Sequence, residues 1–160
     1  MGGSLRNFCE HNSIAMPTFY KNLRKICKYE GIPFIVDETE TGLGATGKNW
    51  GHEHWYLEGD QVPDLMTFGG KAGLGGFFSS LDFRLDENAA QWNQNIDITK
   101  LLHFAEIFKV FERDEVFHWQ NDTAQFLKIE LARVARSNEF GIVNNLRGNS
   151  LHLGWDVKDK

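Results

Sequence analysis

The sequence predicts an α/β fold, because short apolar runs of strand length precede longer segments with helical periodicity. Three compact apolar runs lie in the first half of the chain, at 33–37, 64–68 and 75–79. From residue 99 onward, apolar residues recur at helical spacing over two longer segments. The chain has 160 residues and is 41% hydrophobic, which is enough to bury the core of one ordinary domain.

The first expected helix begins near Thr18, whose hydroxyl is suited to cap an N-terminus, and it ends before Gly31. Its apolar side chains recur at helical spacing, at Phe19, Leu23, Ile26 and Cys27. The unbroken apolar run at 33–37 then predicts a short strand that is buried on both faces, as in a parallel sheet. A glycine-rich stretch at 41–51 follows, before the strands expected at 64–68 and 75–79.

The second half of the chain is expected to be mainly helical, with one helix from Thr99 and another over 122–136. The apolar stripe of the first of these helices consists of Leu101, Phe104, Ala105, Phe108 and Phe111. Residues 151–157 alternate apolar and polar side chains, which predicts a half-buried strand of a different character. We expect this last strand to begin a second subdomain.

Composition and charge argue against several classes of protein. The formal net charge is −5 and no long basic run occurs, which argues against a general nucleic-acid binder. No apolar run approaches the length of a membrane span, and the first residues lack the apolar core of a signal peptide. The two cysteines, Cys9 and Cys27, give no disulfide framework, so a reducing compartment is the simpler expectation.

The segment from Gly42 to Gly47 matches the dinucleotide-loop pattern G-x-G-x-x-G, and with Lys48 it nearly matches the phosphate loop of nucleotide hydrolases. Both patterns need a helix directly after the glycines, because its N-terminus receives the phosphate groups. The residues that follow include Gly51 and have no apolar stripe, and Asn49 replaces the Ser or Thr that would hold magnesium. We therefore expect neither kind of site here.

Two other groups of polar residues give only weak indications. His52 and His54 could supply two imidazoles on one face of a strand, but the other histidines lack the spacing of further metal ligands. We therefore expect no metal site. Asp37 and Glu38 are adjacent carboxylates, and neighbours on a strand point to opposite faces, so a shared acid–base site is not expected.

Asp37 and Lys71 form the pair that best fits a cofactor. Each follows an expected buried strand, and ligands of α/β sheets bind at the carboxyl ends of strands. A carboxylate keeps the pyridine nitrogen of pyridoxal phosphate protonated, and a lysine forms the Schiff base and then carries a proton. The alternative is an ordinary ion pair at the sheet edge, and the residue chemistry alone favours that alternative.

Two long blocks carry a resemblance, "FIVDETETGLGATGKNWGHEHW" at 34–55 and "PDLMTFGGKAGLGGFF" at 63–78. Weaker similarity extends upstream through "FYKNLRKICKYEGI" and downstream through "NNLRGNSLHLGWDV". Together these segments resemble the class-III, fold-type-I aminotransferases, and in particular the 4-aminobutyrate aminotransferases. The resemblance covers essentially the whole chain.

The resemblance implies roles for three residues. By position, Asp37 matches the aspartate that pairs with the pyridine nitrogen of pyridoxal phosphate, and Lys71 matches the lysine that forms the Schiff base. Glu40 stands where the family has a glutamine near the phenolic oxygen of the cofactor. An amide donates a hydrogen bond to a phenolate, whereas an ionised carboxylate repels it. Other departures are Gly69-Gly70 in place of Ser-Lys, "QWNQNID" without a threonine, and Ser150 in place of a glycine.

The resemblance also implies an architecture. Residues 1–136 would be part of the large pyridoxal-phosphate-binding domain, a mainly parallel sheet with flanking helices and the connecting helices after it. Residues 137–160 would begin the C-terminal small domain. The family's phosphate-binding turn, its ring-stacking aromatic residue and its carboxylate-binding arginine are expected outside these 160 residues, so the chain matches a central fragment.

Two functions are implied. The first is a transaminase chain that moves an amino group from a small ω-amino acid to a 2-oxo acid and is expected to be inactive alone. The second is a degenerate aminotransferase that serves as a structural or accessory subunit of a larger assembly. Either needs a protein partner, which would be the other copy of a homodimer, a complementary fragment or a larger complex. The family implies the mitochondrial matrix or the cytoplasm.

Overall fold

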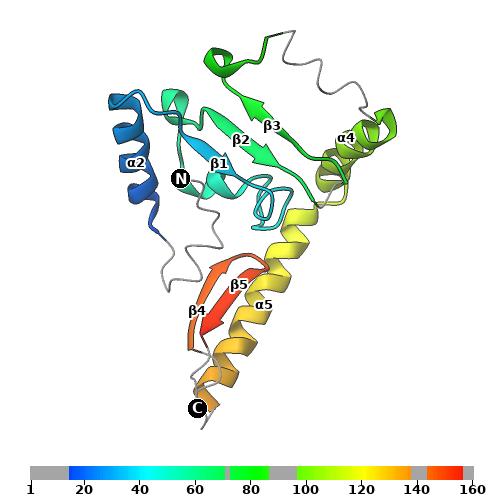
Figure 1. Ribbon diagram of the computed structural model, residues 1–160. Helices are drawn as coiled ribbons and strands as arrows, with labels where there is room; N and C mark the ends of the chain where they lie inside the picture. The colour runs from blue at the N-terminus through cyan, green and yellow to red at the C-terminus, as the bar shows by residue number, and fades with distance from the viewer. Residues whose placement is uncertain (1–14, 71–72, 87–96, 138–143, 157–160) are drawn as a thin grey trace.

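The structure is a computed structural model that describes residues 15–70, 73–86, 97–137 and 144–156. Strands β1 (Ile35–Asp37), β2 (Leu65–Phe68) and β3 (Gly76–Ser79) form one sheet in that order (Figure 1). β1 and β2 are parallel, and β2 and β3 are antiparallel. The predicted α/β class is confirmed.

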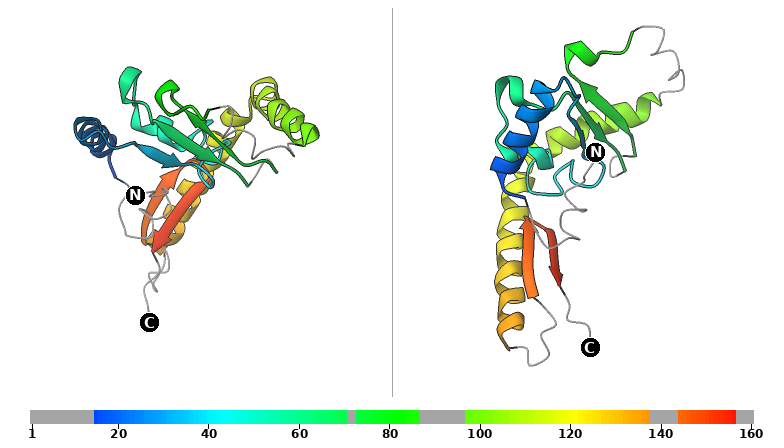
Figure 2. Two further views of the ribbon diagram at one scale, coloured as in Figure 1. Left: turned by 45° about the horizontal axis from the view of Figure 1, so that its top comes forward. Right: turned by 60° about the vertical axis from the view of Figure 1, so that its left-hand side comes forward.

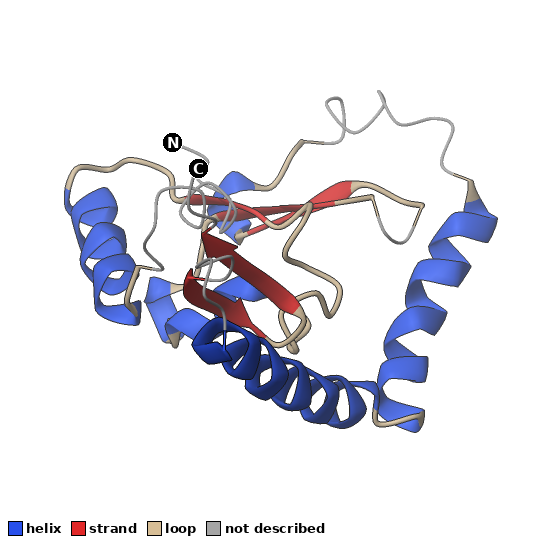
Figure 3. Cartoon of the chain, turned by 90° about the horizontal axis from the view of Figure 1, so that it is seen from below, coloured by secondary structure: helices blue, strands red, loops and turns tan. Residues whose placement is uncertain are grey.

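In the described ranges, three α-helices and a hairpin accompany this sheet. Helix α2 (Pro17–Tyr29) lies on the β1 side and α4 (Ile98–Arg113) on the opposite side (Figure 3). Helix α5 (Val116–Ser137) runs away from the sheet, and the antiparallel hairpin of β4 (Asn144–Asn149) and β5 (His152–Asp156) lies along it (Figure 2). Among the described residues, no helix is both long and apolar enough to cross a membrane.

The two ends of α2 differ in how well the sequence predicted them. Pro17 occupies the first turn, where the backbone N–H that proline lacks would have no partner within the helix. Met16 is the N-cap residue. The prediction that Thr18 caps this helix is therefore wrong. The predicted stop is confirmed, because Gly31 has φ +66°, a left-handed conformation that glycine adopts without strain.

The core lies between α2 and β1. Tyr20, Phe34, Val36 and Trp55 are buried together, and the rings of Tyr20 and Trp55 stack with centroids 3.7 Å apart and planes 7° apart. Trp55 comes from a five-residue 3-10 helix, η1 (Gly51–Trp55). His52 and His54 therefore lie on a 3-10 helix, where they do not share the face that a strand would give them.

A bidentate ion pair ties α2 to the sheet. Nη1 and Nη2 of Arg24 donate to Oδ2 and Oδ1 of Asp64 at 2.6 and 2.8 Å. The backbone N–H of Phe34 donates to the same carboxylate at 2.8 Å. The Arg24 and Asp64 side chains are only 9% and 15% exposed, so water screens this ion pair little. The pair joins helix α2, Phe34 just before β1 and the segment just before β2.

The sheet is less covered than the sequence predicted. Phe34 and Val36 are buried, but Ile35 between them is 48% exposed, so the described residues cover one face of β1 only. Phe77 and Phe78 of β3 are also exposed. The predicted burial on both faces is wrong for the strand at 33–37, because β1 is an edge of the described sheet. β3 is antiparallel because the connection from β2 is too short for a crossover.

A row of aromatic rings connects the sheet to the two long helices. Phe104 stacks on Phe68 with centroids 5.0 Å apart, and Phe108 lies 6.2 Å from Trp50. The predicted stripe of α4 is thus confirmed for its phenylalanines, whereas Leu101 and Ala105 are exposed. The row continues from α4 to the beginning of α5 through Phe111 and Phe117, whose centroids are 5.1 Å apart.

The C-terminal elements differ from the prediction in extent. Helix α5 begins at Val116, six positions before the predicted start at Asp122. The predicted strand at 151–157 is confirmed as β5 over His152–Asp156, and Val157 lies outside the described residues. Strand β4, which pairs with β5, was not predicted, because "NNLRGN" has no apolar alternation.

The glycine-rich loop at 41–51 packs between the sheet, α5 and the hairpin. Nε2 of Gln120 on α5 donates to the carbonyl oxygen of Gly44 at 2.8 Å. A Cβ atom at Gly47 would lie 2.5 Å from Oδ1 of Asn121 on α5 and 2.8 Å from Cβ of Ser150 in the hairpin turn. The glycines of this loop therefore allow close backbone packing between parts of the protein.

Asp64→Asn is expected to lower the free energy of unfolding by about 3 kcal/mol, because it leaves the buried Arg24 guanidinium without its charged partner. Asp60→Asn is the control, since its ion pair with Lys28 is exposed and should change stability little. Chemical denaturation of the two variants measures the difference. Equal losses in both variants would contradict the assigned role of the buried pair.

Gly47→Ala is expected to lower the free energy of unfolding by at least about 2 kcal/mol, from backbone strain at φ +81° and from overlap with Asn121 and Ser150. Gly59→Ala is the matched control, because Gly59 has φ +59° but no atom within 4 Å of the added Cβ. It should cost only the strain, about 1 kcal/mol. Thermal or denaturant unfolding that ranks the two variants equally would show that the close packing does not matter.

Candidate functional site

Asp37 is the last residue of β1 and lies in register with Thr67 of the parallel strand β2. Its Oδ1 accepts hydrogen bonds from the backbone N–H of Thr39 at 3.0 Å and from the Thr67 hydroxyl at 2.8 Å. The Thr39 N–H is the main cause that holds the pKa of Asp37 below its ordinary value. Burial opposes it, and the side chains of Thr39 and Thr67 lower the pKa further. Asp37 is therefore an ionised carboxylate at the carboxyl end of the sheet.

The segment that precedes Lys71 lies beside this carboxylate. A Cβ atom at Gly69 would be 3.8 Å from Cγ2 of Thr39, and one at Gly70 would be 3.7 Å from the Thr39 carbonyl oxygen. Gly70 also has φ +77°, which favours glycine at this position. The structure thus brings the ends of β1 and β2 together, while Lys71 itself lies outside the described residues.

Glu40 lies in the turn that follows β1, three residues after Asp37, and its side chain is exposed. Asp37 and Glu40 therefore belong to one short segment at the carboxyl end of the sheet. The stretch "QWNQNID", a departure from the family pattern, lies mostly outside the described residues.

Glu38 is a residue whose importance the sequence did not reveal. It is 2% exposed, and its carboxylate accepts hydrogen bonds from the Gly51 N–H at 2.9 Å, the His52 N–H at 2.7 Å, Nδ1 of His52 at 2.8 Å and the Thr41 hydroxyl. Burial raises the pKa of Glu38, but the hydrogen bonds from His52, Thr41 and Gly51 outweigh it, and the pKa lies below its ordinary value. The signal in the sequence was an acid placed directly before a glycine-rich loop.

Asp37 and Glu38 serve different surroundings, as predicted for neighbours at the end of a strand. Asp37 accepts from Thr39 and Thr67, whereas Glu38 accepts from the loop at 41–52. The two carboxylates share none of these donors, so they do not form a paired acid–base site.

The histidines of η1 are held by protein groups. Nδ1 of His52 donates to Glu38, and Nε2 of His54 lies 3.0 Å from the Thr46 carbonyl oxygen. Burial is the main cause that lowers the pKa of His54 below its ordinary value. Within the described part of the chain, no group of three or more His, Cys, Asp or Glu side chains is arranged to hold a metal ion.

The two phosphate-binding patterns lack their structural context. The helix after Gly47 is only the five-residue η1, which is too short to act as the phosphate-binding helix of either pattern. Nζ of Lys48 donates to the Glu53 carbonyl oxygen at 3.3 Å and lies 5.0 Å from the ring centroid of Tyr56. The lysine of the phosphate-loop pattern is thus engaged on the protein surface.

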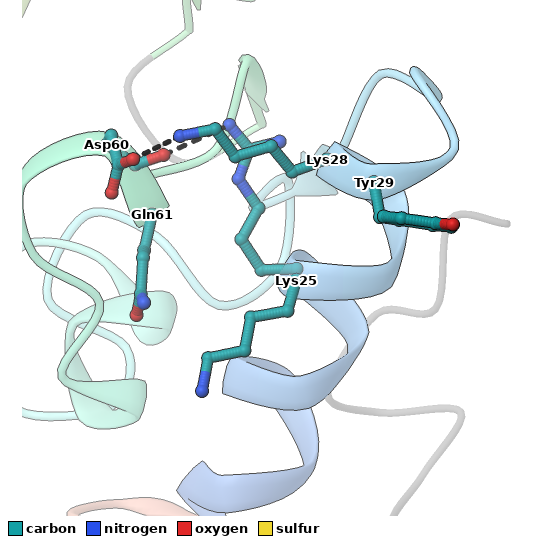
Figure 4. Close-up of a pocket in the computed structure, with 6 residues that line it drawn as sticks. Lys25, Lys28, Tyr29, Asp60 and Gln61 are labelled. Atoms are coloured by element: carbon teal, nitrogen blue, oxygen red, sulfur yellow. Dashed lines mark hydrogen bonds and ion pairs between the residues drawn. The ribbon is translucent and has the colours of Figure 1, made fainter.

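A pocket between α2 and the 3-10 turn η2 (Gly59–Gln61) has a different character (Figure 4). Lys25, Lys28, Tyr29, Asp60 and Gln61 line it together with Arg24. Lys28 pairs with Asp60 across it, and Arg24 is committed to Asp64. The charges of Arg24 and Lys28 are neutralised by Asp64 and Asp60. We therefore interpret this pocket as the contact between α2 and η2, and it is separate from the ligand site predicted at Asp37.

Residues 12–160 match the family model described as aminotransferase class-III. The chain is 34% identical over 146 residues to 4-aminobutyrate aminotransferase of Dictyostelium discoideum, covering 91% of this chain and 29% of that protein. It is 40% identical over 141 residues to a probable mitochondrial 4-aminobutyrate aminotransferase of Caenorhabditis elegans, covering 88% and 29%. The chain therefore spans 29% of the length of these relatives.

Solved structures show the same fold at lower sequence identity. A lysine aminotransferase from Mycobacterium tuberculosis, in its internal aldimine form, matches 89% of this chain and 33% of its own, with a TM-score of 0.69 and 21% identity. An S-selective transaminase from Bacillus megaterium matches 91% and 32%, with a TM-score of 0.71 and 18% identity. The family model covers nearly all of the sequence and the fold agrees with it, so this chain belongs to the class-III aminotransferases.

Proposed function

We propose that this chain is part of a pyridoxal-phosphate-dependent transaminase that moves an amino group from a small ω-amino acid to a 2-oxo acid. The observation that carries the proposal is the ionised Asp37 at the carboxyl end of the β1–β2 pair, within a sequence block typical of the family. The relatives named as 4-aminobutyrate aminotransferases support the substrate class. Because the chain spans 29% of those relatives, the activity would belong to an assembly of this chain with further protein.

Class-III aminotransferases use pyridoxal phosphate, which when bound supplies an electron-withdrawing ring. Asp37 fits one end of that ring. Both of its hydrogen bonds from Thr39 and Thr67 go to Oδ1, and a carboxylate has about four lone-pair sites, so Asp37 retains acceptor capacity for a pyridinium N–H. Its lowered pKa keeps it negative at neutral pH, as such a partner requires.

Lys71 is proposed as the residue that bonds to the cofactor and then carries a proton to and from the substrate. Its place in the sequence supports this role, since it comes four residues after Thr67, whose hydroxyl binds Asp37. Gly69 and Gly70, which come just before it, carry no side chain and lie next to Thr39, so they add no bulk at the carboxyl end of β2, where a flat ligand would bind.

A degenerate aminotransferase acting as a structural or accessory subunit is the second candidate. Glu40 favours it, because an ionised carboxylate near the phenolic oxygen of the cofactor weakens binding where a glutamine would strengthen it. The exposed apolar side chains of β1 and β3 also favour a chain that is covered by other protein.

We propose that residues 1–136 belong to the large domain of the family and that 137–160 begin the small domain. The end of α5 at Ser137 and the separate two-stranded sheet after it support this boundary. The partner is proposed to be a second copy, a complementary fragment or a larger complex, and the location to be the mitochondrial matrix or the cytoplasm. The names of several relatives include the mitochondrial location.

Lys71→Ala is expected to abolish the visible absorbance of lysine-bound pyridoxal phosphate in the purified protein with any co-purifying partner. Lys25→Ala, a change to an exposed lysine on α2, should leave this absorbance unchanged. No absorbance in the unaltered protein at saturating cofactor would exclude the enzyme and favour the structural subunit. Absorbance that survives Lys71→Ala would show that another lysine binds the cofactor.

Glu40→Gln is expected to tighten pyridoxal phosphate binding about tenfold, the equivalent of about 1.4 kcal/mol, because a hydrogen-bond donor replaces a repelling charge. Glu58→Gln removes an exposed carboxylate from the cap of η2 and serves as the control. Fluorescence titration of the two variants against the unaltered protein measures the effect. Weaker binding by Glu40→Gln would show that Glu40 has a favourable role at the site.

A further inference from the structure

The loop at 41–51 depends on one buried side chain. Oε2 of Glu38 accepts from the Thr41 hydroxyl and from the Gly51 N–H, and Oε1 accepts from the N–H and Nδ1 of His52. The Glu38 carbonyl oxygen also accepts from the Gly42 N–H at 2.9 Å. Glu38 therefore binds both the start of the loop, at Thr41 and Gly42, and its end, at Gly51 and His52.

These contacts require a carboxylate and not merely a polar side chain. Each of the two oxygens accepts two donors, and an ionised carboxylate is a pure acceptor. A glutamine at this position would turn an NH₂ group toward one of these donor pairs. The Thr41 hydroxyl has the freedom to rotate and accept, but the backbone N–H of Gly51 or His52 would lose its buried partner.

The same turn holds the hydrogen bond that fixes Asp37. The Glu38 N–H donates to the Thr67 carbonyl oxygen at 2.9 Å, which extends the pairing with β2 by one residue beyond Asp37. Thr39, inside the turn closed between Glu38 and Gly42, donates its N–H to Asp37 at 3.0 Å. The direction of this N–H therefore depends on a turn that the Glu38 side chain secures through Thr41.

We propose that Glu38 is a positioning residue for Asp37, which acts by locking the turn at 38–42 against the end of the loop at 51–52. The hydrogen bonds of its carboxylate go to Thr41, Gly51 and His52, so Glu38 would act on Asp37 through the Thr39 backbone. The part of this proposal that concerns cofactor binding rests on the proposed function, whereas the part that concerns the turn does not.

The experiment compares Glu38→Gln and Glu38→Asp with the control Glu53→Gln. Glu53 also lies in this region, but its carboxylate accepts only from the Trp50 N–H among the bonds described. Amide hydrogen exchange without cofactor should speed up at least about tenfold at Thr39, Gly51 and His52 in Glu38→Gln, relative to the amides of α5. Glu53→Gln should leave Thr39 unchanged.

Cofactor affinity is the second readout, because a purely structural role would move it only in step with global stability. Pyridoxal phosphate binding should weaken about tenfold in Glu38→Gln at a temperature where the variant is fully folded. Glu38→Asp keeps the charge and should recover part of the affinity, and Glu53→Gln should retain all of it. Thr41→Val, which removes a single donor, replaces Glu38→Gln if that variant does not fold and should speed exchange at Thr39 to a smaller extent.

Two results would overturn the positioning role. One is unchanged exchange at Thr39 in Glu38→Gln and Thr41→Val. The other is exchange that rises equally throughout α5, which would make Glu38 a contributor to global stability only. If the unaltered protein binds no pyridoxal phosphate, the proposed function fails, and the exchange of Thr39 still decides whether Glu38 orders the turn.

Discussion

The buried carboxylate of Glu38 is the constraint on which the centre of this structure depends. An ionised carboxyl that is shielded from water must be matched by donors, or its burial would cost several kcal/mol. The chain satisfies it by turning back within fourteen residues, so that Gly51 and His52 return to the end of β1. The path of the glycine-rich loop follows from this requirement.

That path determines how the rest of the molecule is joined. With both ends of the loop hydrogen-bonded to Glu38, its middle packs against α5 and the hairpin turn. At Gly44 and Gly47 the neighbouring side chains leave little room for a Cβ atom. The 3-10 helix η1, which follows this loop, places Trp55 against Tyr20 of α2 in the core. A pattern that looks like a phosphate cradle in the sequence thus serves as a joint between the sheet and the C-terminal elements.

The sequence predicted the elements whose side chains alternate or recur clearly, such as the strand that ends at Asp37 and the phenylalanine stripe of α4. It did not predict β4, since "NNLRGN" is polar and its pairing depends on β5. It gave no sign of the 3-10 helix η1, because five residues of such a helix carry no periodic signal. Glu38 escaped detection for a related reason: its partners Gly51 and His52 are distant in sequence, and adjacent acids at a strand end are common.

Asp37 and Glu40 are proposed to act on the two ends of one cofactor ring, and their effects differ in kind. A carboxylate at the pyridine nitrogen stabilises a positive charge that the chemistry needs, whereas a carboxylate near the phenolic oxygen opposes a negative charge that forms there. Glu40 is exposed, and charges in contact with water interact weakly because the solvent screens them. The repulsion at Glu40 should therefore be smaller than the attraction at Asp37, which is partly buried and tied to Thr39 and Thr67. This inequality favours a transaminase with weakened cofactor binding over a subunit that has lost the chemistry altogether.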